Sequence, residues 1–69
     1  MPSSVVKTIA YEIEHSRLTV TFVSGRVYEY YLVPPSVAQA FSSSTSKGTY
    51  FNRHIRDHYT CREKITSAA

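Results

Sequence analysis

One alternating segment in the middle of the chain limits the possible fold more than any other feature. Residues 17–23, RLTVTFV, alternate apolar and polar side chains and are rich in β-branched residues, which is typical of a half-buried strand. The residues SGR that follow include Gly25, which favours a tight turn into a second strand over 27–33. We therefore predict an antiparallel hairpin at the centre of a β-sheet.

The length of the hairpin connection decides which side chains of the second strand face the core. A two-residue connection would turn the Glu29 carboxylate toward the apolar face, and burial of an unpaired charge is costly. A three-residue connection at 24–26 instead places Tyr28 and Tyr30 on that face and turns Tyr31 away. The expected opposite pairs are then Phe22 with Tyr28, Val20 with Tyr30, and Leu18 with Leu32.

One more strand and two helices are predicted around this hairpin. Residues 5–13 alternate with Val5, Ile9, Tyr11 and Ile13 on one face. Pro34 and Pro35 end the last strand, because proline cannot donate to a ladder, and Pro35 suits the start of a helix over 35–43. The polar run SSSTS ends that helix, and a second helix is expected over 46–59, with an apolar arc of Phe51, Ile55 and Tyr59.

The fold class expected for this small single domain is α+β. A three-stranded antiparallel meander, formed by 5–13, 17–23 and 27–33, would pack against the two C-terminal helices, with an ordered core over about 5–60 and a tail over 61–69. The predicted core consists of Ile9, Tyr11, Leu18, Val20, Phe22, Tyr28, Tyr30, Val37, Phe41, Phe51, Ile55 and Tyr59.

The ends and the cysteine content favour a cytoplasmic protein. The segment MPSSVVKTIAYE lacks the basic and apolar regions of a signal peptide, and no apolar run approaches the roughly 20 residues that cross a bilayer. With Cys61 as the single cysteine, an internal disulfide cannot form, which fits a reducing compartment. We expect no membrane partner.

The net charge of +3 is concentrated in the last third of the chain. Residues 1–46 are balanced, whereas 47–69 carry Lys47, Arg53, Arg56, Arg62 and Lys64 against Asp57 and Glu63. Such a segment can contact successive phosphates, although a solvated helix carries similar charge and Asp57 can pair with Arg53.

A nucleic-acid-binding module, preferably for RNA, is therefore the leading functional hypothesis. Neutral donors would come from Asn52 and Thr49, and Tyr31 or Tyr50 would stack on unpaired bases. The alternative is a protein-interaction module in which the same helix or an exposed edge strand docks on a partner. The salt dependence of binding separates the two hypotheses.

Catalytic and metal sites are poorly supported by the residue patterns. His54, His58 and Cys61 form H-x3-H-x2-C, but a fourth ligand is missing and His15 is distant in sequence. Cys61 has no oriented base, and Gly25 and Gly48 are too few for a phosphate loop. We expect no enzymatic activity, no cofactor, no metal and no small-molecule substrate.

Three segments resemble the KTSC domain family: IAY at 9–11, LTVTFVSGRVYEYYLVP at 18–34 and SKGTYFNRHIRDHY at 46–59. The Y-x-Y of Tyr28 and Tyr30, followed by Val33-Pro34, and the run from Ser46 to Arg56 keep both the residues and the spacing of that family. The family is named for its place at the C-terminus of some lysyl-tRNA synthetases, and it also occurs as small stand-alone proteins.

The resemblance implies a compact α+β domain of bacterial or phage origin. It carries no established activity, and RNA binding is suggested by the association with synthetases. A binding role transfers to Lys47, Asn52, Arg53 and Arg56, the positions also reached from charge.

Overall fold

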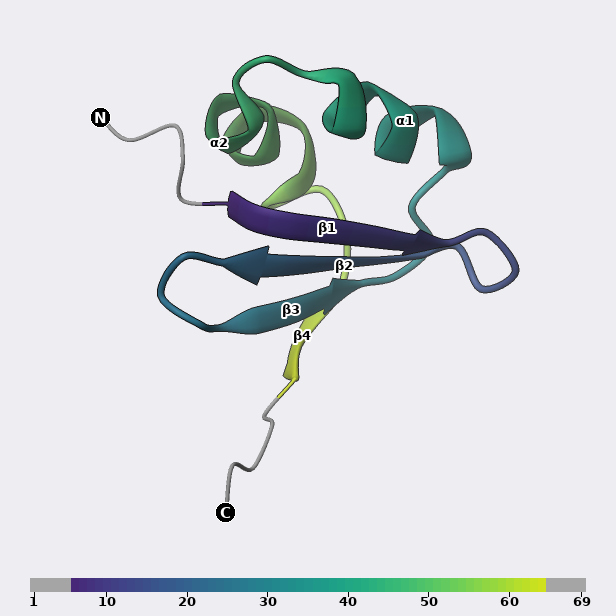
Figure 1. The fold of residues 1–69 in the computed structure, drawn as a ribbon. Coiled ribbons are helices and arrows are strands. Elements are labelled where there is room, and N and C mark those ends of the chain that lie inside the picture. The colour runs from purple at the N-terminus through teal and green to yellow at the C-terminus, as the bar shows by residue number, and fades with distance from the viewer. Residues whose placement is uncertain (1–5, 65–69) are drawn as a thin grey trace.

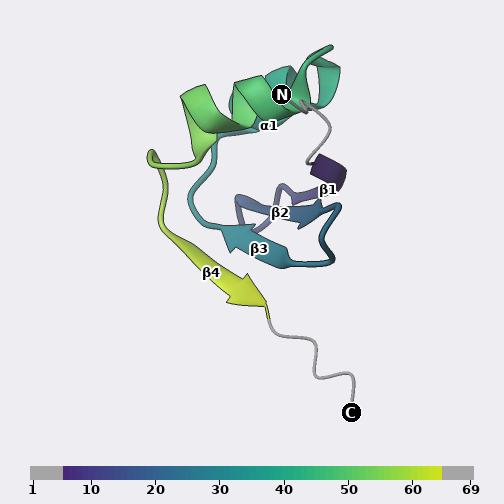
Figure 2. The same cartoon turned by 90° about the vertical axis from the view of Figure 1, so that its left-hand side faces the viewer.

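The predicted hairpin lies in the middle of an antiparallel sheet. The computed structural model describes residues 6–64, in which β1 (Val6–Glu12), β2 (Arg17–Phe22) and β3 (Val27–Tyr30) follow one another both in sequence and in the sheet. The helices lie over one face of this sheet and leave the other face open (Figures 1 and 2). The α+β class with an antiparallel sheet and two helical segments is confirmed.

The sheet has four strands, so the prediction of three was wrong. Residues Cys61–Lys64, which the sequence assigned to a tail, form β4 and pair antiparallel with β3 at the edge of the sheet. The backbone N–H of Tyr31 donates to Thr60 O at 2.9 Å and extends this pairing. All four side chains of β4 are exposed, so the strand has no apolar alternation and is held by main-chain pairing. Residues 65–69 of the expected tail, and residue 5 of the expected first strand, lie outside the described residues.

The hairpin connection has three residues, as expected, but it lies one position earlier in the chain. Phe22 N–H donates to Arg26 O and Gly25 N–H donates to Phe22 O, both at 2.8 Å, so residues 23–25 form the loop. Its last residue, Gly25, has a φ of 98°, the left-handed conformation that this position of a three-residue loop requires. A loop at 24–26 would have placed Arg26 there.

The register therefore differs by two residues from the predicted one. Val20 lies opposite Tyr28 and Leu18 opposite Tyr30, in place of the expected pairs Phe22 with Tyr28, Val20 with Tyr30 and Leu18 with Leu32. A shift of two leaves every side chain on its original face, because side chains alternate with a period of two. The prediction that Tyr28 and Tyr30 face the core is confirmed.

Two helical segments connect β3 to β4. Helix α1 (Pro35–Ser43) begins at Pro35, as predicted. Helix α2 (Lys47–Tyr50) continues directly into a π-helical segment, η2 (Phe51–Ile55), in which Arg56 N–H donates to Phe51 O. The expected helix over 46–59 therefore ends near Ile55, and residues 56–59 turn toward β4. No helix within residues 6–64 is long and apolar enough to cross a membrane.

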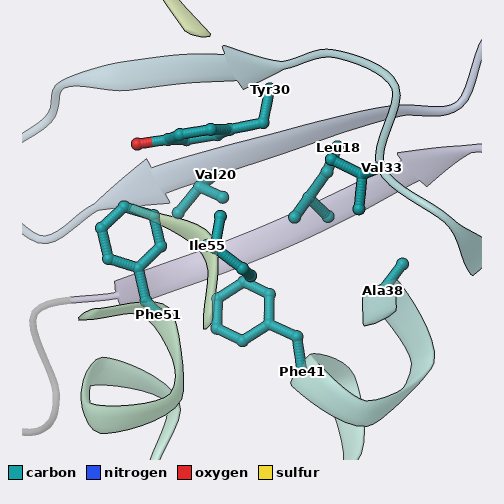
Figure 3. Close-up of a cluster of buried hydrophobic side chains, with 8 residues drawn as sticks. All are labelled: Leu18, Val20, Tyr30, Val33, Ala38, Phe41, Phe51 and Ile55. Carbon is teal, nitrogen blue, oxygen red and sulfur yellow. The ribbon is translucent and has the colours of Figure 1, made fainter. Parts of the chain in front are cut away.

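The core lies between the sheet and the helices and agrees with most of the prediction (Figure 3). Six predicted residues are buried, and the other six are partly buried and pack against them. The prediction missed Val33 and Ala38. Val33 lies beyond the end of β3, where Ser16 O accepts its N–H at 2.9 Å and Tyr11 donates its hydroxyl to Val33 O at 2.6 Å. The buried residues are Leu18, Val20, Tyr30, Val33, Ala38, Phe41, Phe51 and Ile55.

Leu32 makes the turn that brings Val33 into the core. Its φ is 59°, a left-handed conformation that is unfavourable for leucine, and its side chain is 80% exposed. The prediction that Leu32 faces Leu18 was wrong, because β3 ends at Tyr30, three residues before its predicted end at residue 33.

The fully buried side chain of Ile55 should contribute strongly to stability. We expect Ile55→Ala to lower the free energy of unfolding by about 2–5 kcal/mol, through lost burial and the cavity left behind. Urea denaturation followed by circular dichroism measures this loss. Ile13→Ala is the matched control, since Ile13 is 67% exposed and its truncation should change stability by less than about 0.5 kcal/mol. Similar losses in both variants would contradict the described core.

The backbone of Leu32 offers a test in the opposite direction. Leu32→Asn should raise the free energy of unfolding by about 0.5–1 kcal/mol, because asparagine tolerates the left-handed conformation better than leucine. Leu32→Val should lower it, since a β-branched side chain is worse at positive φ. Thermal denaturation of both variants checks the order, and a more stable valine variant would contradict the described backbone.

Candidate functional site

A pocket of about 560 Å³ lies between η2 and the helix-facing side of β2, β3 and β4. Its size falls within the range of about 300–1,000 Å³ that is common for small-ligand sites. One side is aromatic and the other is polar. The aromatic side consists of Phe22, Tyr28, Tyr30 and Phe51, and the remaining lining residues are Asn52, Arg56, Asp57 and Cys61.

The aromatic side is a set of rings in edge-to-face contact. Phe51 lies 5.2 Å from Phe22 and 5.5 Å from Tyr30 between ring centroids, with interplanar angles of 75° and 81°. Phe22 contacts Tyr28 at 5.6 Å and 79°. Tyr30 and Phe51 are buried, whereas Phe22 and Tyr28 are half-buried and keep part of their rings open. The contacts fix the orientation of the rings, so the pocket has a preformed aromatic wall.

Tyr30 places a phenol hydroxyl in this pocket. Burial raises the pKa of Tyr30 above its ordinary value, and the adjacent Cys61 side chain raises it further. The positive charge of Arg56 acts in the opposite direction and is a smaller influence. At neutral pH the hydroxyl is therefore protonated and can donate a hydrogen bond.

The polar side of the pocket comes from the end of the second helical segment. Arg56 donates to Asn52 Oδ1 at 3.5 Å, a long contact between exposed side chains. Among residues 6–64, the ion pair between permanently charged groups within 4.0 Å is that of Glu12 with Arg17, and His15 Nδ1 also lies 4.0 Å from Glu12 Oε1. The expected pairing of Asp57 with Arg53 is therefore not formed, and the charged groups at the pocket can accept a ligand.

The structure brings together only part of the predicted binding surface. Asn52, Arg53 and Arg56 are exposed on one helical segment, where Arg56 lies three residues after Arg53 and four after Asn52. Lys47 begins the same segment, and its Nζ donates to Ser44 O at 3.0 Å. Thr49 is exposed nearby and accepts from the Ser46 hydroxyl at 3.2 Å.

Arg62 and Lys64 lie on the opposite face of the sheet. In the pairing of β3 with β4, Tyr30 is opposite Cys61 and Glu29 is opposite Arg62. Opposite residues share a face. Since Cys61 lines the pocket, Arg62 and Lys64 point to the open face, away from the helices. The sequence grouped them with the helix because it assigned no strand there.

The two tyrosines predicted to stack on bases are engaged within the protein. Tyr50 stacks on Phe41 at 5.7 Å and lies 4.5 Å from the ring of His54. Tyr31 donates its hydroxyl to Glu29 at 3.0 Å, and this hydrogen bond raises the pKa of Tyr31. The ring surface beside the basic helix is instead that of the pocket. The sequence did not reveal it because Tyr28 and Tyr30 were assigned mainly to core packing.

The weak metal candidate His54, His58 and Cys61 is not assembled. His54 packs on Tyr50, the Nε2 atom of His58 lies 2.9 Å from Arg53 O, and Cys61 lines the pocket. Residues 6–64 contain no group of three or more His, Cys, Asp or Glu side chains that could hold a metal ion.

Comparison with known proteins gives a consistent family relationship. Residues 2–59 match the family model of the KTSC domain. A KTSC domain protein from Yersinia pestis has a crystal structure that is similar to this chain, with a TM-score of 0.85 and 32% identity over 94% of this chain and 92% of that one.

Two kinds of protein contain a segment similar to this chain, a large ligase and a small protein. A lysine–tRNA ligase from Nostoc punctiforme is 45% identical over 56 residues, which are 81% of this chain and 10% of the ligase. An uncharacterized protein from Stutzerimonas stutzeri is 38% identical over 60 residues, 86% of this chain and 84% of that protein. The chain thus spans about a tenth of the ligase and most of the smaller relative.

The buried hydroxyl of Tyr30 predicts a loss of stability at alkaline pH. The pKa of Tyr30 is higher in the folded state than in the unfolded state, where it is about 10. The protonated hydroxyl therefore contributes fully to the free energy of unfolding below about pH 10, and this contribution is lost as the pH rises above that value. Urea denaturation across this range measures the fall in the free energy of unfolding. Tyr30→Phe should reduce the fall, and an unchanged slope in this variant would assign the loss to other groups.

Proposed function

The chain belongs to the KTSC domain family, and we propose that it is a non-enzymatic module that binds single-stranded RNA. The observation that carries the proposal is the aromatic pocket beside Arg56 and Asn52. Proteins that recognise unpaired bases combine aromatic surfaces with nearby cationic groups that meet the phosphates. This pocket offers both within a volume suited to one base.

The basic residues of the second helical segment provide the phosphate contacts. Arg56 lines the pocket, Arg53 is exposed three residues earlier on the same segment, and Lys47 lies at the start of that segment. Asn52 adds a neutral donor at the pocket itself. Bases in a duplex are stacked and paired, so only an unpaired base can enter the pocket, which favours a single strand or a loop.

The names of the relatives support the preference for RNA. Relatives of this chain include segments of proteins named lysine–tRNA ligase. The matched segment is about a tenth of such a ligase, so the proposal concerns binding of the nucleic acid and excludes the ligase reaction.

A protein partner is the second candidate, and two exposed side chains favour it. Leu32 and Ile13 are large, apolar and 80% and 67% exposed. They follow the ends of β3 and β1, which lie at the same end of the sheet. The turn at Leu32 does not require a leucine, whose exposed side chain gains no burial within the domain, so a contact with another protein would explain the residue.

Removal of the two helix arginines should weaken RNA binding. We expect Arg53→Gln with Arg56→Gln to lower the affinity for a short single-stranded RNA and to reduce the slope of log K against log salt by about 1.4, since each lost phosphate contact accounts for about 0.7. Fluorescence anisotropy at several salt concentrations measures both quantities.

The matched control removes two charges from the other face of the sheet. Arg62→Gln with Lys64→Gln changes the net charge equally but leaves the pocket side intact. It should keep most of the salt slope. If both double variants lowered the affinity for RNA equally, neither face would be the specific binding surface, and the proposal would be contradicted. An affinity for RNA that did not depend on salt would favour the protein partner.

A further inference from the structure

We propose that the pocket selects guanine among the unpaired bases of a single-stranded RNA, an inference that rests on the proposed function. The pocket combines aromatic rings with one guanidinium, Arg56, and one carboxylate, Asp57. These two groups have opposite hydrogen-bonding character, since Arg only donates and an ionised Asp only accepts. Together they define which base edge fits.

Guanine is the base whose edges match both groups. Its O6 and N7 atoms are adjacent acceptors that take the two parallel donors of an arginine fork, the commonest specific contact to a base. Its N1–H and 2-amino group are adjacent donors that a carboxylate can accept with both oxygens. No other standard base presents a pair of acceptors beside a pair of donors.

The two groups that guanine requires both line the same pocket. O6 and N1–H are neighbouring groups on the guanine ring, so the donor fork and the carboxylate must also be neighbours. Arg56 and Asp57 are consecutive, and both line the pocket. No ion pair within 4.0 Å joins them. Arg56 donates one N–H to Asn52 Oδ1 at 3.5 Å, so its other N–H groups and the Asp57 carboxylate remain for a ligand.

The same arrangement rejects the other bases. Adenine carries an amino group where guanine has O6, which would set a donor against the Arg56 guanidinium. Uracil and cytosine lack the N7 atom and cover less of the aromatic wall. Discrimination of this kind comes from unpaired or opposed polar groups as well as from favourable contacts.

Two further polar groups of the pocket, on Tyr30 and Asn52, suit a planar ligand that is held by its edges. The Tyr30 hydroxyl lies on the aromatic side, while Asn52 lies beside Arg56 and contacts it. Half-buried Phe22 and Tyr28 provide ring surface against which the base can pack. The guanine would therefore lie on the aromatic wall with its polar edges directed at the helix end.

The test compares short oligouridines that carry one central guanosine, adenosine, cytidine or inosine, with guanosine monophosphate as a separate ligand. Binding of the oligonucleotides is measured by fluorescence anisotropy, and binding of the nucleotide by changes in amide chemical shifts. Both measurements use the wild-type chain, Asp57→Asn and Glu14→Gln. Glu14 is exposed in the turn after β1, so its substitution removes the same charge away from the pocket. Asp57 is also exposed, so its substitution leaves the core intact.

We expect the guanosine oligonucleotide to bind at least about tenfold more tightly than the adenosine one, and inosine, which lacks the 2-amino group, to fall between them. Asp57→Asn should remove most of this preference, and Glu14→Gln should keep it. Persistence of the preference in Asp57→Asn would overturn the assigned contact.

The remaining outcomes separate the two proposals. Equal binding of all oligonucleotides would overturn guanine selection and leave RNA binding standing. If guanosine monophosphate shifted the amide resonances of the pocket residues but no RNA bound, the pocket would still recognise guanine. The proposal that the guanine belongs to an RNA would then be overturned. The absence of binding by both kinds of ligand would overturn both proposals.

Discussion

The register between β2 and β3 is the constraint on which the core and the pocket both depend. Gly25 ends the hairpin loop in a left-handed conformation, which places Tyr28 opposite Val20 and Tyr30 opposite Leu18. A slip by one residue would turn both tyrosines to the open face and bury the Glu29 carboxylate. The observed register directs the Y-x-Y pair toward the helices, where Tyr30 completes the core and Tyr28 remains half-exposed.

The π-helical segment determines what the tyrosines face. Phe51 and Ile55 both reach the core, and the wide turn between them ends with the Arg56 N–H bonded to Phe51 O. π-helical turns are rare and occur often at functional sites. Here the turn ends the helix beside the aromatic rings, so the backbone then reverses toward β4 with Arg56 and Asp57 at the pocket. Packing and site therefore come from the same few residues.

Sequence periodicity predicted which side chains face the core. It failed where the structure is determined by main-chain pairing or by local backbone conformation. The alternation of 17–23 and the four-residue repeat of Phe51 and Ile55 correctly assigned most of the core. Residues Cys61–Lys64 have no apolar alternation, so the sequence did not predict that they form a strand. The pocket was missed for a related reason. Charge identified Arg56, and aromaticity identified Tyr28 and Tyr30, but their proximity depends on where the helix ends.

Charge alone does not choose between the two faces of this domain. Arg53 and Arg56 lie on the helix side, and Arg62 and Lys64 lie on the open face, where Glu29 faces Arg62. Two or three phosphate contacts give a shallow salt slope of about −2 at most, so electrostatics would supply only weak binding. In the proposed complex with RNA, selectivity would then come from a feature that one face has and the other lacks. The preformed aromatic pocket would be that feature, since base stacking adds about 1–3 kcal/mol per base without further charge.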